Sequence, residues 1–187
     1  MRPGVLVALL LTFGLLPPAA AQPAVRTVVV AEFENASVDS IAWHAGQFSA
    51  LLGQLLQQQG GAPLRVVGAA AAAQAMRALG YTPADLVSPA RAAEVARLVG
   101  ADWIITGRWS QLRLVALPDP VDRLEPIPPA RDVLAVADVT VRVLDAGTRR
   151  TLFEGRFGGQ AAGDGYGSLY IAAYQALAAA ARSVVRL

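Results

Sequence analysis

The order in which hydrophobic patterns follow one another most constrains how this chain can fold. Two short β-branched runs flank an amphipathic stretch, and this succession predicts two strands joined by a helix. Further helical and strand-like stretches follow, in the order β-α-β-α-α-β-β-β-α. This order predicts an α/β sandwich with a mixed sheet and helices packed on it. The expected strands are 27–33, 64–67, 102–114, 136–144 and 151–157, and the expected helices are about 41–58, 68–79, 89–99 and 168–185.

Glycines and apolar spacings predict three details of this plan. Gly107 interrupts the strand 102–114, which predicts a bend or bulge there. The glycine-rich run 158–167 predicts a flexible connector. It lacks the lysine and the spacing of a phosphate-binding P-loop. In the last helix four apolar residues recur on one side, which predicts that this side faces the sheet; they are Ile171, Tyr174, Leu177 and Ala181.

The first 21 residues have the pattern of a secretory signal peptide. Arg2 precedes the apolar run Val5–Leu16, two prolines follow, and three alanines end at Ala21. The run is shorter than the roughly 20 residues that a membrane-spanning helix needs. We therefore expect a signal peptide at 1–21 and a single domain at 22–187. An uncleaved N-terminal anchor is the alternative. We expect no membrane span in the mature chain.

Composition excludes several kinds of chemistry. The chain of 187 residues has no cysteine, one histidine and no lysine among its 16 basic residues. Thiolate metal sites, disulfides and a bacterial lipid-anchor cysteine are therefore excluded, as are multi-histidine metal sites. Schiff-base mechanisms need a lysine and are excluded too. We expect neither a cofactor nor a metal.

The net charge of +2 at pH 7 is only a weak indication of nucleic-acid binding. Once Arg2 is removed with the leader, 15 arginines face 14 acids. The arginines are scattered, and only Arg149 and Arg150 are adjacent. Nucleic-acid binders present a basic stripe or patch. We therefore expect no nucleic-acid partner.

Three stretches resemble the CsgG-like family of bacterial envelope proteins. The first, VVAEFEN at 29–35, is similar to that family's opening strand. The second, LVGADWIITG at 98–107, is similar to its most specific signature, and VTVRVLDAGT at 139–148 is similar to its hairpin. The resemblance covers roughly residues 27–187. It implies the fold of the periplasmic part of the curli secretion channel, of the LpoB-type activators of cell-wall synthases and of the N-terminal domain of TolB. It also implies a protein-binding or self-assembling module rather than an enzyme.

The chain departs from the channel-forming members of that family in two ways. Those members carry an N-terminal lipidated cysteine, which is absent here, so we expect no lipid anchor. They also carry two long amphipathic hairpins that assemble into a barrel. The one long insertion here, 115–134, is rich in proline and acids and predicts a loop. Secretion-channel activity is therefore not carried over from the resemblance.

The candidate partner-binding residues are one tryptophan and several arginines, because these residue types most often anchor interfaces. Trp109 and Arg113 stand beside the proline-rich loop, and we weigh this interpretation equally against Trp109 filling the core. Arg149 and Arg150 occupy the predicted turn of the hairpin, where they could meet an acidic partner or simply keep the turn soluble. Arg123, within the proline-rich loop, completes the set.

Two weaker patterns would suit a hydrolase. His44 follows Asp39 and Ser40, but an exposed helix histidine is the simpler interpretation. Glu32 and Glu34 alternate on a strand and are predicted to share a face, as paired acid/base carboxylates do. Solvated acids at a strand end explain them as well.

The sequence therefore predicts a non-catalytic, exported module of the bacterial cell envelope. It would dock on other envelope proteins of the cell-wall or secretion machinery, and it could self-associate through sheet edges or helix faces. A ring-forming component of a secretion or pilus apparatus is the first alternative. A small secreted carboxylate-dependent hydrolase is the second.

Overall fold

The computed structural model describes residues 25–37, 45–59, 63–116, 133–163 and 165–187. The predicted leader, His44, Arg123 and the prolines of the predicted loop lie outside these ranges. The described elements are β1 (Arg26–Val30), β2 (Glu34–Asn35), α1 (Ala45–Gln58), β3 (Leu64–Val67), α2 (Ala69–Leu79), the 3₁₀ helix η2 (Pro83–Val87), α3 (Pro89–Leu98), β4 (Trp103–Ala116), β5 (Val133–Asp145), β6 (Thr151–Gly163) and α4 (Tyr166–Val184).

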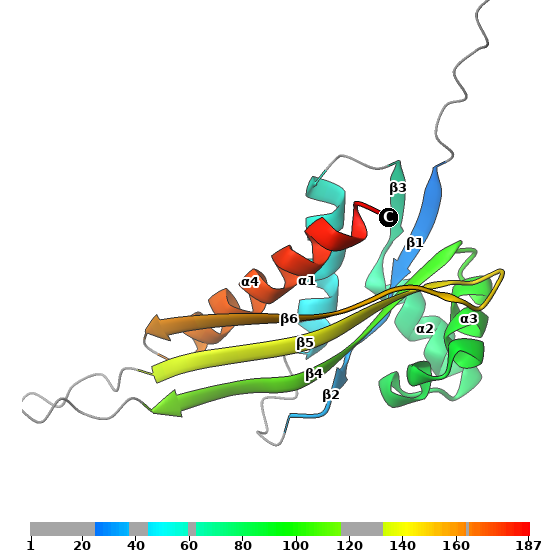
Figure 1. Ribbon diagram of the computed structural model, residues 1–187. Coiled ribbons are helices and arrows are strands. Elements are labelled where there is room, and N and C mark those ends of the chain that lie inside the picture. The colour runs from blue at the N-terminus through cyan, green and yellow to red at the C-terminus, as the bar shows by residue number, and fades with distance from the viewer. Residues whose placement is uncertain (1–24, 38–44, 60–62, 117–132, 164) are drawn as a thin grey trace, which may run out of the picture.

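The strands form one mixed sheet in the order β3-β1-β4-β5-β6, and β2 pairs separately with β4. β1 is parallel to both β3 and β4, whereas β4, β5 and β6 are antiparallel. α1 and α4 lie side by side on one face, and α2 and α3 lie on the other face near β1 (Figure 1). The predicted α/β fold with a mixed sheet is confirmed, with β2 and η2 as additions.

The core has two parts, one on each face of the sheet. The larger part joins α1 and α4 to the sheet and contains Phe33, Phe48 and Trp109. The smaller part joins α2 and α3 to β1 and β4. β4 contributes side chains to both parts, because successive residues of a strand point to opposite faces of the sheet. Ile104 faces the smaller part of the core, and Ile105 faces the larger part. Of the predicted apolar side of α1, Phe48, Leu51, Leu52 and Leu55 are buried as expected; Ile41 lies outside the described residues.

The first predicted strand is interrupted at Phe33. β1 ends at Val30; the Ala31 N–H still donates to the Ile105 carbonyl oxygen of β4 at 2.9 Å, and strand pairing with β4 resumes at Glu34. Between them the Phe33 N–H donates to Ser49 Oγ at 2.9 Å instead of to a strand. A Cβ on Gly107 would lie 2.5 Å from the Phe33 ring. Gly107 therefore allows a close aromatic approach, and the prediction of a bulge at this residue is wrong. The irregularity lies between Trp109 and Gln111.

The hairpin strands are longer than predicted. β4 continues to Ala116 and β5 begins at Val133, so both ends of the predicted 115–134 loop belong to the sheet. The prediction of a connector from Gly158 is also wrong, because β6 continues to Gly163. Glycine inside β6 allows α4 to approach the strand closely. A Cβ on Gly159 would lie 1.9 Å from the carbonyl oxygen of Ala172 in α4.

The side of α4 that faces the sheet differs from the predicted one. Leu177 and Ala181 are buried as predicted, but Ile171 is 50% exposed and Tyr174 43% exposed. The buried side consists mainly of alanines, because the helix lies too close to β6 to accommodate larger side chains. Among the described residues, no helix combines the length and the apolar character needed to cross a membrane.

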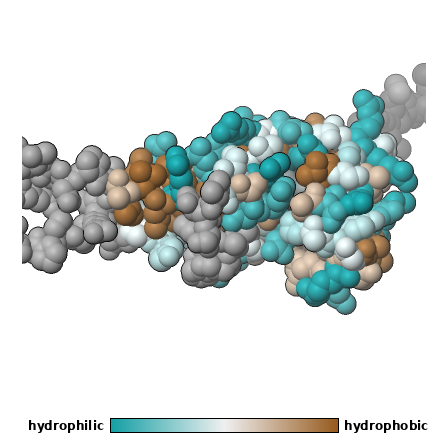
Figure 2. All heavy atoms as spheres, turned by 90° about the horizontal axis from the view of Figure 1, so that it is seen from below, coloured by the Kyte–Doolittle hydropathy of each residue, from teal (hydrophilic) through white to brown (hydrophobic). Residues whose placement is uncertain are grey.

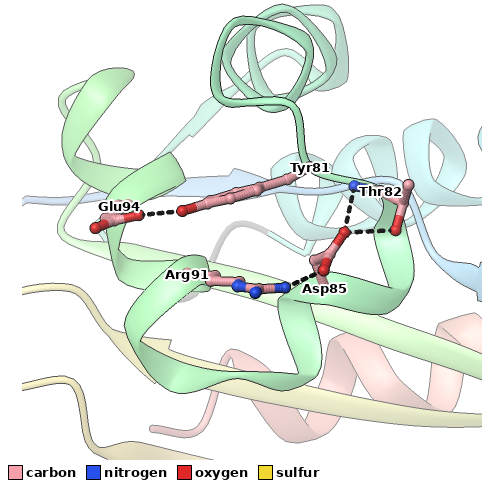
Figure 3. A network of polar contacts seen from close by, with 5 residues as sticks. All are labelled: Tyr81, Thr82, Asp85, Arg91 and Glu94. Atoms are coloured by element: carbon pink, nitrogen blue, oxygen red, sulfur yellow. Dashed lines mark hydrogen bonds and ion pairs between the residues drawn. The ribbon is translucent and has the colours of Figure 1, made fainter.

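A polar network fastens η2 to α3 (Figure 3). The backbone N–H and the hydroxyl of Thr82 both donate to Asp85 Oδ2, at 2.8 and 2.7 Å. Arg91 of α3 pairs with the other oxygen of Asp85 and stacks 5.4 Å from the centre of the Tyr81 ring. The Tyr81 hydroxyl donates to Glu94. The network positions η2 at the edge of the uncovered part of the sheet.

We expect Gly159→Ala to destabilise the protein by about 2–3 kcal/mol, because the new methyl group would overlap helix backbone that cannot move alone. Gly158→Ala is the matched control. Its Cβ would lie 3.9 Å from the Ala137 carbonyl oxygen, an ordinary contact, so we expect a change within about 0.5 kcal/mol. Urea denaturation of both variants measures the difference. Equal effects would contradict the close approach of α4 to β6.

We expect the Thr82–Asp85 contacts to stabilise the fold only above acidic pH. The hydrogen bond from the Thr82 N–H lowers the pKa of Asp85, with help from the Thr82 hydroxyl and Arg91. A carboxyl whose pKa is lower in the folded state adds stability above its unfolded pKa of about 3.9 and loses it as pH falls. Asp85→Asn should therefore have a lower free energy of unfolding than wild type near neutral pH. The difference between the two proteins should become smaller at about pH 3. Urea denaturation at the two pH values measures this difference in unfolding free energy. A difference that is the same at both pH values would contradict a stabilising role of the ionised Asp85.

Candidate functional site

The best candidate for a binding surface is the part of the sheet that the described helices leave uncovered. Every second residue of β4, β5 and β6 points away from α4. α2, α3 and η2 cover this side over β1 and over the adjoining parts of β4 and β5 (Figure 1). The remaining surface, which we call the open face, consists of Arg108, Gln111, Arg113, Asp138, Thr140, Arg142, Glu154, Arg156 and Gln160.

Arginines and carboxylates alternate across the open face. Arg142 lies opposite Glu154 in register, and its Nε is 3.0 Å from Glu154 Oε2. Arg156 Nε donates to both oxygens of Asp138, at 2.8 and 2.9 Å. The side chain of Arg156 is 66% exposed and that of Glu154 48%. Such exposed pairs add little to stability. Arg156 and Glu154 are therefore accessible from solvent, whereas their partners Asp138 and Arg142 are only 17% and 25% exposed.

A groove of about 250 Å³ lies where the open face meets η2. Arg142 spans it, since its Nη1 donates to the carbonyl oxygen of Val87 at 3.0 Å. Arg108 lies on the other side, with its Nε 3.6 Å from Glu34 Oε2. The lining thus combines two arginines and two glutamates with a small apolar strip. The lining residues are Glu34, Pro83, Leu86, Val87, Thr106, Gly107, Arg108, Thr140, Arg142 and Glu154.

The chemistry of the groove suits recognition of a polar chain better than catalysis. Its volume is below the 300–1,000 Å³ typical of small-molecule pockets. Its hydroxyls belong to Thr106 and Thr140, and none of the described residues that line it is a histidine. In the part of the chain that the structure describes, no three acidic or histidine side chains gather as metal ligands would. Arginine guanidinium groups can instead bind carboxylates and carbonyl groups of another protein.

Figure 2 shows the molecule from the side away from α4. Hydrophilic side chains cover the middle of this view, whereas hydrophobic atoms gather at the end where β4 finishes. Val115, near the end of β4, is 36% exposed. The polar surface thus has an apolar margin at one end.

The structure separates the predicted partner-binding residues. Trp109 is fully buried between Phe33 and Phe48, with ring centres 6.3 and 5.4 Å away. It fills the core, so the alternative of a surface anchor is wrong for this side chain. Among the described residues its Nε1 has no hydrogen-bond partner. Arg113 is exposed on the open face and makes no ion pair within the described ranges.

Arg149 and Arg150 are exposed at the turn between β5 and β6, at the other end of the hairpin. Arg113 lies opposite Val136, nine residues of β5 before Asp145. At the rise of a strand this separation is about 30 Å. Asp145 holds the turn, since its Oδ1 accepts from the Thr148 N–H at 2.7 Å, which lowers the pKa of the Asp145 carboxyl. Arg113 and the turn arginines therefore do not form one patch. Arg123 lies outside the described residues.

The two predicted carboxylates contact different elements. Glu34 faces Arg108 in the groove. Glu32 approaches the start of α1, where a Cβ on Gly46 would lie 3.6 Å from its Oε1. The structure does not bring them together as a catalytic pair. His44 lies outside the described residues, so its role in a hydrolase stays a prediction.

Sequence reasoning missed most of the open face. Asp138, Arg142, Glu154 and Arg156 were each visible as polar positions of predicted strands. A regular hairpin with its turn at 145–150 would have put Arg142 opposite Phe153, and only the register shift between Val143 and Leu144 places it opposite Glu154. The contacts of Arg108 and of Val87 could not be found this way, because they join elements far apart in the sequence.

No family model matches this sequence, and no curated protein matches it. Solved structures do match the fold. The lipoprotein GNA1162 from Neisseria meningitidis aligns with a TM-score of 0.58 at 15% identity, over 87% of this chain and 99% of that one. LpoB from Escherichia coli aligns with a TM-score of 0.52 at 18% identity, over 87% and 80%. The PelC dodecamer from Paraburkholderia phytofirmans aligns with a TM-score of 0.51 at 17% identity, over 85% and 86%.

These likenesses confirm the LpoB-type fold that the sequence motifs implied. The more specific relation to the curli channel and to TolB stays a prediction. At such low identities the comparisons establish the fold alone, and this chain therefore shares the α/β fold of LpoB, GNA1162 and PelC.

Proposed function

We propose that the chain is a non-catalytic, exported binding module of the bacterial cell envelope that docks on other proteins through the open face. One observation carries this proposal. The open face presents exposed arginines and acids on a rigid sheet, and the described helices leave it uncovered. Two proteins that share the fold support the envelope setting. GNA1162 is a lipoprotein, and LpoB is of the LpoB type of cell-wall synthase activator that the sequence motifs resemble.

Rigidity favours this surface as a docking site. The open-face side chains stand on three paired strands, so binding does not require the backbone to become ordered. Arg113 makes no ion pair among the described residues, and a partner carboxylate could bind it without displacing another acid. Arginine is also among the residues that most often dominate binding energy at interfaces. An envelope protein with an acidic or carbonyl-rich segment fits this chemistry.

We expect the double variant Arg108→Ser/Arg113→Ser to lose affinity for the envelope partner by roughly tenfold or more, because two exposed guanidinium groups leave the open face. The partner would be isolated by cross-linking in envelope extracts, and its affinity would be measured by titration with purified protein. Arg77→Ser, on the exposed side of α2, is the control and should bind like wild type. Unchanged binding of the double variant would exclude the open face as the docking site.

A ring-forming component of an envelope apparatus is a second candidate function. The observation that favours it is the likeness to PelC, which forms a dodecamer. Size-exclusion chromatography with light scattering tests this candidate, because a strict monomer at micromolar concentration would remove it.

A further inference from the structure

β6 forms one edge of the sheet along 13 residues (Figure 1). β5 pairs with one side of β6, and no strand among the described residues pairs with the other side. Natural edge strands are often very short or contain proline, because an open edge can pair with another chain. β6 is long and contains no proline, so the described part of the chain leaves this edge open to a further strand.

Alternate residues of an antiparallel strand direct their backbone groups away from the paired neighbour. In β6 one such residue is Gln160, because its N–H donates to Gln175 Oε1 of α4 at 3.2 Å and not to β5. The register with β5 is regular from Phe153 onwards. Glu154 and Arg156 therefore direct their backbone groups to the open edge, as Gln160 does. An added strand can pair with these two residues without displacing the Gln175 amide.

α4 crosses the sheet obliquely and does not follow β6 along its whole length (Figure 1). Near its beginning it approaches β6, where a Cβ on Gly159 would lie 1.9 Å from the Ala172 carbonyl oxygen. At its end Val184 lies with Arg26 and Leu64, at the other side of the sheet. The first half of β6 is therefore the part that is farther from the helix.

The first half of β6 contains a segment that is symmetric about Gly155. It consists of residues 153–157, with the sequence FEGRF, and we call it the symmetric segment. Glu154 and Arg156 belong to the open face, and their side chains are 48% and 66% exposed. The Phe153 and Phe157 rings stack on the other side of the sheet with centres 6.1 Å apart. A Cβ on Gly155 would lie 2.6 Å from the Phe153 ring, so glycine allows the rings to close over the strand.

We propose that the symmetric segment pairs with the same segment of a second copy of this chain. The two strands would be antiparallel and related by a two-fold axis at Gly155. In this register Glu154 lies opposite Arg156 of the second copy, and Phe153 lies opposite its Phe157. Opposite charges and aromatic pairs that face each other across strands stabilise a sheet. The unlike residues that meet in this two-fold contact are therefore complementary on both faces.

The backbone geometry supports the same register. Glu154 and Arg156 both direct backbone groups to the open edge, so they would form the hydrogen-bonded pairs of the new ladder. Two such pairs supply about four backbone hydrogen bonds. Gly155 would occupy the position between them, where the Cα atoms of two strands approach to about 4.5 Å. Two glycines meet there without side chains in the way.

Pairing of the two copies would also extend the ion pairs of the open face. Within one chain Arg156 contacts Asp138, and Glu154 contacts Arg142. Across the contact the charges would alternate from Asp138 and Arg156 of one copy to Glu154 and Arg142 of the other. Each of the two exposed charges thus gains a second partner of opposite sign, and no like charges face each other.

Other partners fit the symmetric segment less well. A parallel copy in register would place Glu154 beside Glu154 and Arg156 beside Arg156, and like charges that face each other destabilise a sheet. An unrelated strand would have to present a base, an acid and two large apolar residues in matching order. The inference goes beyond partner docking and beyond ring formation, because a two-fold contact of this kind closes with two copies.

The test is sedimentation velocity of the purified chain from micromolar to near-millimolar concentration. A contact of five residues is short, so we expect wild type to form a weak, reversible dimer. Glu154→Arg and Arg156→Glu should each weaken this dimer by at least about tenfold, because like charges would then face each other. Arg77→Glu, on the exposed side of α2, is the matched charge reversal and should dimerise like wild type.

An equimolar mixture of the two variants Glu154→Arg and Arg156→Glu provides the sharpest comparison. In a mixed dimer two arginines of one chain face two glutamates of the other, so the mixture should dimerise although each variant alone does not. The double variant Glu154→Arg/Arg156→Glu should dimerise by itself for the same reason. Misfolded variants would not show this recovery, and circular dichroism checks the fold of each one.

Three results would overturn the inference. The first is a wild type that stays monomeric up to near-millimolar concentration. The second is an assembly of any size that neither single variant weakens. The third is a dimer that the single variants weaken and that their mixture does not restore. Docking on an envelope protein is measured separately with Arg108→Ser/Arg113→Ser, so its failure and the failure of the dimer are distinguishable.

Discussion

The close contact between α4 and β6 is the constraint on which the rest of the structure depends. The backbone of α4 lies so near the sheet that a single methyl group on Gly159 would overlap the Ala172 carbonyl. Contact at this distance requires glycine on the strand and alanine on the helix. Ala172, Ala173, Ala176 and Ala180 are accordingly buried. The amide of Gln175 adds to the contact, since its Oε1 accepts from the Gln160 N–H at 3.2 Å.

This contact also decides which side chains remain outside. Because small residues occupy the inner side of α4, its larger residues Tyr170, Ile171 and Tyr174 lie toward solvent. On the other side of the sheet, α2, α3 and η2 cover β1 and the adjoining parts of β4 and β5, and the charged side chains beyond them stay accessible. The domain thus presents a charged sheet surface and an uncharged helix surface on opposite sides.

Much of the fold could be predicted because it depends on local patterns. The alternation of Val139, Val141 and Val143 indicated a half-buried strand, and all three are buried. Gly80 ends α2 with φ of 69°, the left-handed conformation for which glycine is favoured. The errors share a different cause. The predicted inner side of α4 assumed that the largest apolar side chains are buried, whereas tight helix–sheet packing selected the smallest ones.

The sequence by itself determined the succession of strands and helices, the hairpin and the mixed sheet, because these follow from residue periodicity and turn chemistry. It also excluded thiolate and multi-histidine chemistry through composition. Only the tertiary structure decided that Trp109 is a core residue and that Arg113 is on the surface. It also brought Arg108, Arg142 and Val87 to one groove. These outcomes depend on which distant elements pack together, and no local pattern encodes the distance at which a helix meets a sheet.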